Sequence, residues 1–194
     1  MIWEELTCQL QSLASDNLLR RRRTLESACG PYAVIDGEPF LAFCSNDYLG
    51  LASHPALMEA VASSVRRWGT GSGGSHVVSG HMQPHEELEK ALAAFVGAER
   101  ALFYSTGYMA NIGVVPTLVG RGDAVFADRL NHASLIDAVQ LSRAEHRRYA
   151  HNDMAHLERL LSASTAKRKL ILSDAVFSMD GDLAPLEKLA ELAE

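Results

Sequence analysis

The chain has 194 residues, 47% of them hydrophobic, which fits one globular domain or a large part of one. Its formal net charge of −6 argues against a nucleic-acid partner, and no apolar run has the length of a membrane span. The acidic start Glu4-Glu5 is unlike a signal peptide, and Cys8, Cys29 and Cys44 show neither metal-ligand nor disulfide spacing. We therefore predict a cytoplasmic protein without a bound metal or a membrane partner.

The first 45 residues predict a helix and a β-hairpin. Apolar residues recur at helical spacing from Trp3 onward, which predicts an amphipathic helix over residues 2–27, ended by Gly30-Pro31. The arginine run 20–23 near its end is typical of a solvated helix terminus. Strands are expected at 32–35 and 39–43, because both positions of Asp36-Gly37 accept the positive φ of a tight turn. Residues 1–45 are thus predicted to form an arm.

From residue 46 onward, helices and short strands alternate. This order predicts an α/β fold with a mostly parallel sheet covered by helices on both faces. In such sheets ligands bind at the carboxyl ends of the strands. The glycine-rich stretch 69–80 is predicted to be an ordered loop rather than a flexible linker. Helices are expected at about 55–68, 84–96, 108–119, 133–142, 153–163 and 185–194, and strands at 100–104, 123–127, 145–149 and 169–173.

Three segments that follow predicted strands could form a binding site. The small-residue turn 104–107 opens a helix, and free N–H groups at a helix N-terminus bind phosphate. Asn131 is expected to cap the helix at 133, which places His132 in its first turn with the ring free to lie over a flat ligand. A lone histidine in such a place is more often structural. Ser178 follows a buried strand, where its hydroxyl could reach a ligand's phenolic oxygen, whereas 152–153 should only cap a helix.

Other chemistries are disfavoured by the sequence. It lacks a Gly-x-Ser-x-Gly nucleophile turn and a Gly-x-x-x-x-Gly-Lys phosphate loop. Its eight histidines form no zinc-ligand spacing.

Several motifs match, in order and spacing, those of one enzyme family. From about Asp16 to Glu194 the chain resembles the α-oxoamine synthases, which are pyridoxal-phosphate (PLP) enzymes of fold type I. The resemblance implies that residues 46–194 are the first part of the large PLP-binding domain. The matching segments are Asn46-Asp47-Tyr48-Leu49-Gly50-Leu51, Ser72-Gly73-Gly74-Ser75, Ser79-Gly80, Asn131-His132-Ala133-Ser134 and Val176-Phe177-Ser178-Met179-Asp180-Gly181.

The resemblance implies roles for individual residues. Gly107 and Tyr108 would supply backbone contacts to the PLP phosphate; the family often has Phe at position 108, so the added hydroxyl needs a partner. His132 would stack on the pyridine ring and also contact substrate, and Ser178 would hydrogen-bond the phenolic oxygen of the ring.

The resemblance also implies substrates and an assembly. Arg20 would contact the acyl substrate, with Arg21 as the alternative, and Asn46 would lie near the substrate carboxylate in a homodimer with shared sites. The 72–75 and 19–22 segments are most similar to the family member of biotin biosynthesis. That enzyme is an acyltransferase, which condenses L-alanine with a pimeloyl thioester of CoA or of a carrier protein and releases CO₂.

A Schiff-base lysine, which this chemistry needs, is not found in the family's Ser/Thr-x-x-Lys setting. The four lysines are Lys90, Lys167, Lys169 and Lys188. The catalytic lysine is therefore expected beyond Glu194, and the chain is interpreted as an incomplete half that is inactive alone. The alternatives are glycine C-acetyltransferase or 5-aminolevulinate synthase, a non-catalytic subunit of the same fold, and, less favoured, a lyase acting on sulfur amino acids.

Overall fold

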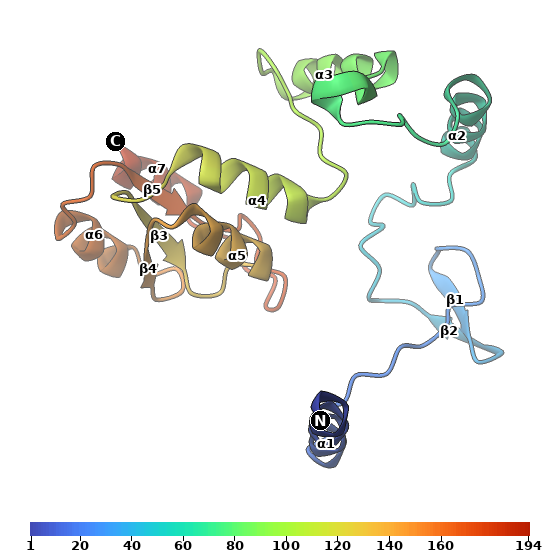
Figure 1. The fold of residues 1–194 in the computed structure, drawn as a ribbon, viewed down its shortest axis with the longest axis horizontal. Coiled ribbons are helices and arrows are strands. Elements are labelled where there is room, and N and C mark those ends of the chain that lie inside the picture. The colour runs from blue at the N-terminus through green and yellow to red at the C-terminus, as the bar shows by residue number, and fades with distance from the viewer. The chain divides into compact units, whose positions relative to one another are not determined.

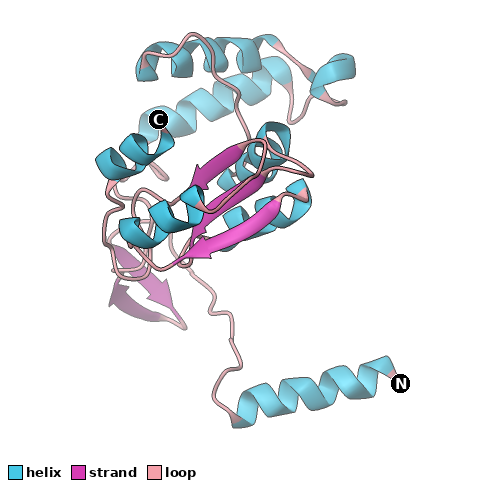
Figure 2. Cartoon of the chain, turned by 90° about the vertical axis from the view of Figure 1, so that its left-hand side faces the viewer, coloured by secondary structure: helices cyan, strands magenta, loops and turns pink.

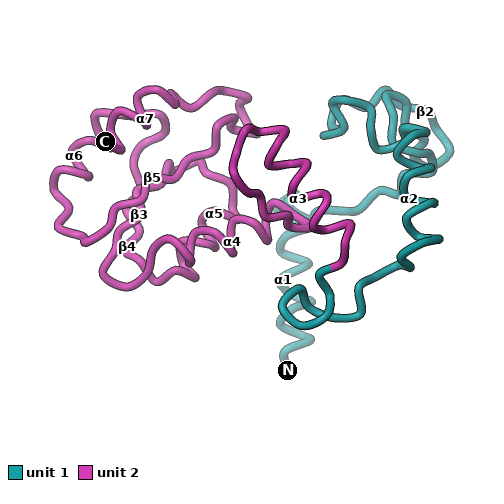
Figure 3. The backbone as a smooth tube through the Cα atoms, turned by 90° about the horizontal axis from the view of Figure 1, so that it is seen from above, with its two compact units in different colours: residues 1–81 teal, residues 82–194 magenta.

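The computed structural model describes residues 1–194, which form two compact units, 1–81 and 82–194 (Figure 3). Each unit is described by itself. The predicted boundary between an arm and a large domain, at residue 45, lies inside the first unit and stays a prediction. None of the helices combines the length and the apolar composition that crossing a bilayer requires.

The first unit contains short elements joined by long connections. They are α1 (Ile2–Ser15), β1 (Tyr32–Ile35), β2 (Glu38–Leu41), α2 (Pro55–Trp68) and one π-helical turn, η1 (His76–Gly80) (Figure 1). The predicted span of the first helix, 2–27, was wrong in its second half. Asn17 takes a positive φ of 56°, and the Leu18 N–H bonds to the Leu13 carbonyl at 2.8 Å. This left-handed C-terminal cap ends the helix before the arginine run.

The hairpin of the first unit is confirmed. Tyr32 pairs with Leu41 and Ile35 with Glu38 in antiparallel register. The turn residues Asp36 and Gly37 have φ values of 54° and 79°, the two positive angles that this kind of turn requires. In the glycine-rich loop, Gly80 is buried against the backbone of Gly74.

The second unit is the expected α/β arrangement. Its three-stranded parallel sheet has the order β4-β3-β5, and each strand is followed by a helix (Figure 2). The α/β class is confirmed. The elements are α3 (Gln83–Val96), α4 (Gly107–Leu118), β3 (Ala124–Asp128), α5 (Ala133–Ser142), β4 (Glu145–Tyr149), α6 (Met154–Ser162), β5 (Lys169–Leu172) and α7 (Leu186–Ala193).

Two apolar layers hold this sheet, because alternate residues of β3 point to opposite faces. Phe126 packs with Leu157 of α6 and Leu189 of α7 on one face. Val125 packs with Val115 of α4 and Val139 of α5 on the other. Helices therefore cover both faces, and the central strand is buried along its whole length.

The strand predicted at 100–104 does not form. A strand exists only where a neighbour accepts and donates its backbone hydrogen bonds, and no segment of residues 1–194 pairs with this one. The Phe103 N–H instead donates to the carboxylate of Glu89 at 3.0 Å.

Candidate active site

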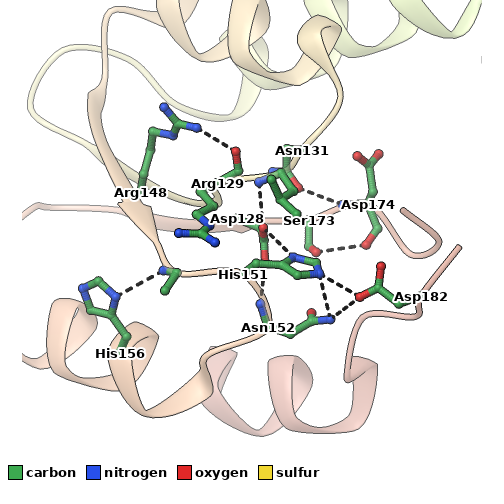
Figure 4. Close-up of polar contacts among 12 residues, drawn as sticks. Asp128, Arg129, Asn131, Arg148, His151, Asn152, His156, Ser173, Asp174 and Asp182 are labelled. Carbon is green, nitrogen blue, oxygen red and sulfur yellow. Dashed lines mark hydrogen bonds and ion pairs between the residues drawn. The ribbon is translucent and has the colours of Figure 1, made fainter. Parts of the chain in front are cut away.

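The candidate site lies at the carboxyl ends of β3, β4 and β5, together with the first turn of α4. Parallel strands bring the loops that follow them to one edge of the sheet. These loops are 129–132, 150–153 and 173–185, and polar side chains from all three meet there (Figure 4).

The first turn of α4 offers two free backbone donors. Thr106 is the N-cap, and its Oγ1 accepts the Met109 N–H at 3.1 Å. The helical ladder begins with Ala110, whose N–H bonds to the Thr106 carbonyl at 3.1 Å. The N–H groups of Gly107 and Tyr108 have no partner within the chain, and a Cβ at Gly107 would meet nothing within 4 Å. This turn can therefore accept an anion such as a phosphate.

The hydroxyl of Tyr108, which was expected to need a hydrogen-bond partner, has one in Asp137. It donates to Oδ2 of Asp137 at 2.9 Å, which ties the first turn of α4 to α5. The hydrogen bond to Asp137 raises the pKa of Tyr108, and the negative charge of that carboxylate adds to the effect. The backbone N–H of Tyr108 is left available for a ligand.

His132 occupies a different position from the one predicted. It is itself the N-cap of α5, and its Nδ1 accepts the Ser134 N–H at 3.2 Å. The Ser134 hydroxyl lies 2.7 Å from the same Nδ1, and Asn111 of α4 donates to that hydroxyl at 2.8 Å. The ring is exposed, so its outer face is open to a ligand.

Asn131 is not the predicted cap, because its side chain crosses to β5. Its Nδ2 donates to the Leu172 carbonyl at 2.9 Å, and its Oδ1 accepts the Asp174 N–H at 3.1 Å. Asp174 in turn accepts the His132 N–H at 2.7 Å. The buried Asn131 amide thus uses both its donor and its acceptor to join the end of β3 to the segment that follows β5. Together with the Asp174 contact, it fixes the backbone of His132 relative to the loop that carries Ser178.

The polar cluster around His151 was missed by the sequence analysis. Nδ1 of His151 lies 3.0 Å from Oδ1 of Asp128, and Nε2 lies 2.7 Å from Oδ2 of Asp182 (Figure 4). Asn152 donates its backbone N–H to Asp128 and its side-chain amide to Asp182, both at 2.9 Å. Asn152 has a positive φ of 53°. The two aspartates lie 23 and 31 residues from the histidine, so local sequence gave no signal.

These contacts favour the protonated form of His151. The hydrogen bond to Asp128 raises the pKa of His151, and Asp182 adds to the effect, while partial burial opposes it. An imidazolium between two carboxylates donates from both nitrogens. The ring also meets Phe177 edge-on, with centroids 4.4 Å apart. His151 therefore ties the end of β3 to the loop 173–185.

The neighbouring Tyr149 is not a candidate base. It is the last residue of β4 and is 1% exposed. Burial raises its pKa to about 12, so the phenol stays protonated at neutral pH.

The other predicted site residues are distributed over both units. Ser178 is exposed in the loop between β5 and α7, which the Phe177–Asp182 and Gly181–Phe177 backbone bonds hold as a turn. Arg20 and Asn46 belong to the first unit, so their approach to this site stays a prediction. Asp153 caps α6 through the His156 N–H at 2.8 Å, as predicted for 152–153.

The four lysines all lie away from these loops. Lys90 is in α3 and Lys188 in α7, while Lys167 and Lys169 are at the amino end of β5, opposite the site. The Lys169 ammonium donates to the Leu161 carbonyl at 2.8 Å. Residues 1–194 therefore place no lysine among the site loops.

The fold and this site define the class of protein. Residues 38–194 match the aminotransferase class I and II family, and the chain belongs to it. This confirms the resemblance to PLP-dependent enzymes of this fold.

Individual relatives within this family are more similar to the chain than the family model alone can show. The chain is 68% identical over its full 194 residues to an 8-amino-7-oxononanoate synthase of Herminiimonas arsenicoxydans, of which it covers 50%. It is 63% identical, over 98% of the chain, to the enzyme of the same name from Azoarcus sp. (strain BH72), of which it covers 49%. The chain thus spans about half the length of the curated relatives that it matches.

Solved structures agree with the sequence comparison. A serine palmitoyltransferase from S. paucimobilis with bound PLP superimposes with a TM-score of 0.89 at 32% identity, over 98% of this chain and 49% of that one. An 8-amino-7-oxononanoate synthase from Francisella tularensis gives a TM-score of 0.66 at 33% identity, over 77% of this chain and 41% of that one.

The residues of the site fit PLP. The two free N–H groups at the start of α4 suit a phosphate, the exposed ring of His132 suits a flat heterocycle, and the exposed hydroxyl of Ser178 can donate to an oxygen.

Proposed function

We propose that this chain is the N-terminal part of an 8-amino-7-oxononanoate synthase. The complete enzyme would condense L-alanine with a pimeloyl thioester and release CO₂ in biotin biosynthesis. The observation that carries the proposal is the site itself: the free donors of α4 and the exposed His132 ring belong to helices joined by the Tyr108–Asp137 and Asn111–Ser134 contacts. The names of the relatives at 68% and 63% identity support this choice of substrates.

The residues of the second unit would bind and orient the cofactor. The N–H groups of Gly107 and Tyr108 would hold the PLP phosphate, with the positive end of the α4 dipole behind them. His132 would lie against the ring, and Ser178 would donate to its phenolic oxygen. Bound PLP would supply the electron sink that stabilises a carbanion at the α-carbon of alanine. The protein would then need only to orient the substrates and move protons.

The remaining parts of the machinery are expected outside the second unit. Arg20 would pair with the acyl substrate and Asn46 would lie near the substrate carboxylate, in a cytoplasmic homodimer with shared sites. A lysine outside residues 1–194 would hold PLP as a Schiff base, so these residues alone should be inactive.

An assay of the complete enzyme tests the proposal. With L-alanine and pimeloyl-CoA, or the pimeloyl carrier-protein thioester, we expect CO₂ release and formation of the 8-amino-7-oxo product. Turnover of glycine with acetyl-CoA or succinyl-CoA instead would assign the protein to another α-oxoamine synthase. A complete chain that has no lysine at the site and no activity would favour the non-catalytic subunit.

Two variants test the assigned residues. His132→Ala should weaken PLP retention and lower kcat; an unchanged cofactor spectrum and rate would remove its stacking role.

Arg20→Ala should raise the KM for the thioester much more than that for alanine. Equal effects on both substrates would leave the arginine run as a solvated segment.

A further inference from the structure

The contacts on His132 determine which ring nitrogen carries the proton. A backbone N–H can only donate, and that of Ser134 points at Nδ1 of His132 at 3.2 Å. Nδ1 must therefore accept, and a neutral imidazole with Nδ1 as acceptor has its proton on Nε2.

The same donor fixes the direction of the neighbouring hydrogen bonds. Because Nδ1 has no hydrogen, the hydrogen in the 2.7 Å contact between Nδ1 and the Ser134 Oγ must come from the serine. The lone pairs of Oγ then remain free to accept, and Nδ2 of Asn111 donates to them at 2.8 Å. The hydrogen bonds thus run in one direction, from Asn111 to Ser134 to His132.

The three residues of this chain of hydrogen bonds differ in exposure: Ser134 is buried, whereas His132 is exposed. Ser134 is 1% exposed, so water does not compete for its hydroxyl. Asn111 lies in the second turn of α4, whose first turn offers the free N–H groups. His132 is exposed, and its Nε2 makes no hydrogen bond within the chain.

We propose that Asn111 and Ser134 are positioning residues that hold His132 in the Nε2–H tautomer and aim this N–H at an oxygen of the bound substrate. His132 then acts as a hydrogen-bond donor through Nε2, to a carboxylate or a thioester carbonyl. It does not act as a base there, because Nε2 has no free lone pair. The role toward substrate rests on the proposed function, whereas the tautomer rests on the contacts alone.

The tautomer can be read directly from the ring nitrogens. Solid-state ¹⁵N spectra of the complete enzyme labelled at histidine separate protonated from unprotonated ring nitrogens, and His132→Gln assigns the signals. We expect an unprotonated Nδ1 and a protonated Nε2 in the neutral ring. A protonated Nδ1 in the neutral ring of the wild-type enzyme would overturn the proposal.

Matched variants test the two positioning residues. Ser134→Thr keeps the hydroxyl and should keep the tautomer. Ser134→Ala retains the backbone N–H at 3.2 Å but loses the shorter contact at 2.7 Å, so the remaining donor should hold the tautomer only in part and give a mixture. Asn111→Asp can only accept, so the serine hydroxyl should turn toward it and the tautomer should again become mixed. A pure Nε2–H ring in both Ser134→Ala and Asn111→Asp would show that neither residue sets it. If one of these two variants does not fold, the tautomer measured in the other still tests the proposal.

Kinetics separate the tautomer from the proposed reaction. In Ser134→Ala, kcat/KM for alanine should fall about tenfold relative to Ser134→Thr, the factor that one hydrogen bond of ordinary net strength contributes. Gln140→Ala, on the exposed side of α5, should leave the rate unchanged. An enzyme with the expected tautomer and no activity toward alanine and pimeloyl thioester would refute the proposed function and leave the tautomer standing.

Discussion

The two units of the chain bury their apolar side chains to very different extents. In the second unit, all five residues of β3 are buried between two layers of helices. In the first unit, neither α1 nor α2 buries a single residue, and Trp3 is 76% exposed. Both units have amphipathic helices. The difference teaches that an apolar stripe in the sequence predicts a helix and indicates that this helix needs a surface to pack against. It does not predict which part of the protein provides that surface.

The largest effect should come from matched truncations of phenylalanine in the two units. Phe126→Ala removes a ring that is fully buried, which should lower the free energy of unfolding by about 3–5 kcal/mol. Phe43→Ala removes a ring that is 89% exposed, and should cost less than about 0.5 kcal/mol. Denaturant unfolding followed by circular dichroism measures both. Equal costs would show that the arm packs as tightly as the sheet.

A smaller effect should follow from loss of the His151 bridge. His151→Gln removes a ring nitrogen that donates to the buried carboxylate of Asp128, which should cost about 2–3 kcal/mol, the range for a hydrogen bond to a charged group. Denaturant unfolding of the variant beside the wild-type protein measures this. An unchanged free energy of unfolding would show that the bridge stabilises nothing.

The bridge also predicts a pH dependence. The pKa of His151 is raised in the folded protein. Its stabilisation should therefore be complete below the unfolded value of about 6.5 and be lost as the pH rises through the folded pKa. Comparing unfolding curves over this range for wild type and His151→Gln isolates the effect. A wild-type stability that rises with pH relative to the variant would contradict the assignment.

The smallest of these effects should be local to the first unit. A Cβ at Gly80 would collide with the Gly74 carbonyl oxygen, so Gly80→Ala should cost about 2 kcal/mol through displacement of the loop 69–80. A Cβ at Gly71 meets nothing within 4 Å, which makes Gly71→Ala the matched control. Limited proteolysis of the loop measures the difference. Equal cleavage of both variants would mean that the loop is not ordered as described.

Most elements could be predicted from the sequence because their signals are local. The helix at 55–68 has a proline at its first position and a glycine after its last, and the structure gives α2 the same bounds. The hairpin turn was identified by Asp36-Gly37. Two local predictions were wrong for identifiable reasons. Asn17 ends α1 early although Leu18 continues the apolar spacing, and residues 100–104 have strand composition but no partner strand.

The site was only partly predictable, because its contacts join residues far apart in the chain. The free N–H groups at the start of α4 could be predicted, because helix-terminus chemistry is local. Asn131 had the composition of a cap, yet its amide bridges to Leu172, 41 residues away. His151 lies between a strand and a capped helix, and no motif in the neighbouring sequence indicates its two aspartate partners. Sequence spacing shows which loops meet at the sheet edge, but not which side chains pair within them.

The carboxylate of Asp128 serves several groups at once. It accepts the backbone N–H groups of Leu130 and Asn152 as well as the His151 ring. A change at Asp128 therefore alters what His151 and Asp182 contribute, and their mutational costs should not add. Single substitutions at Asp128, His151 or Asp182 should therefore be rare among natural variants of this protein. If the three positions vary during evolution, they should covary, with compensating changes arriving together.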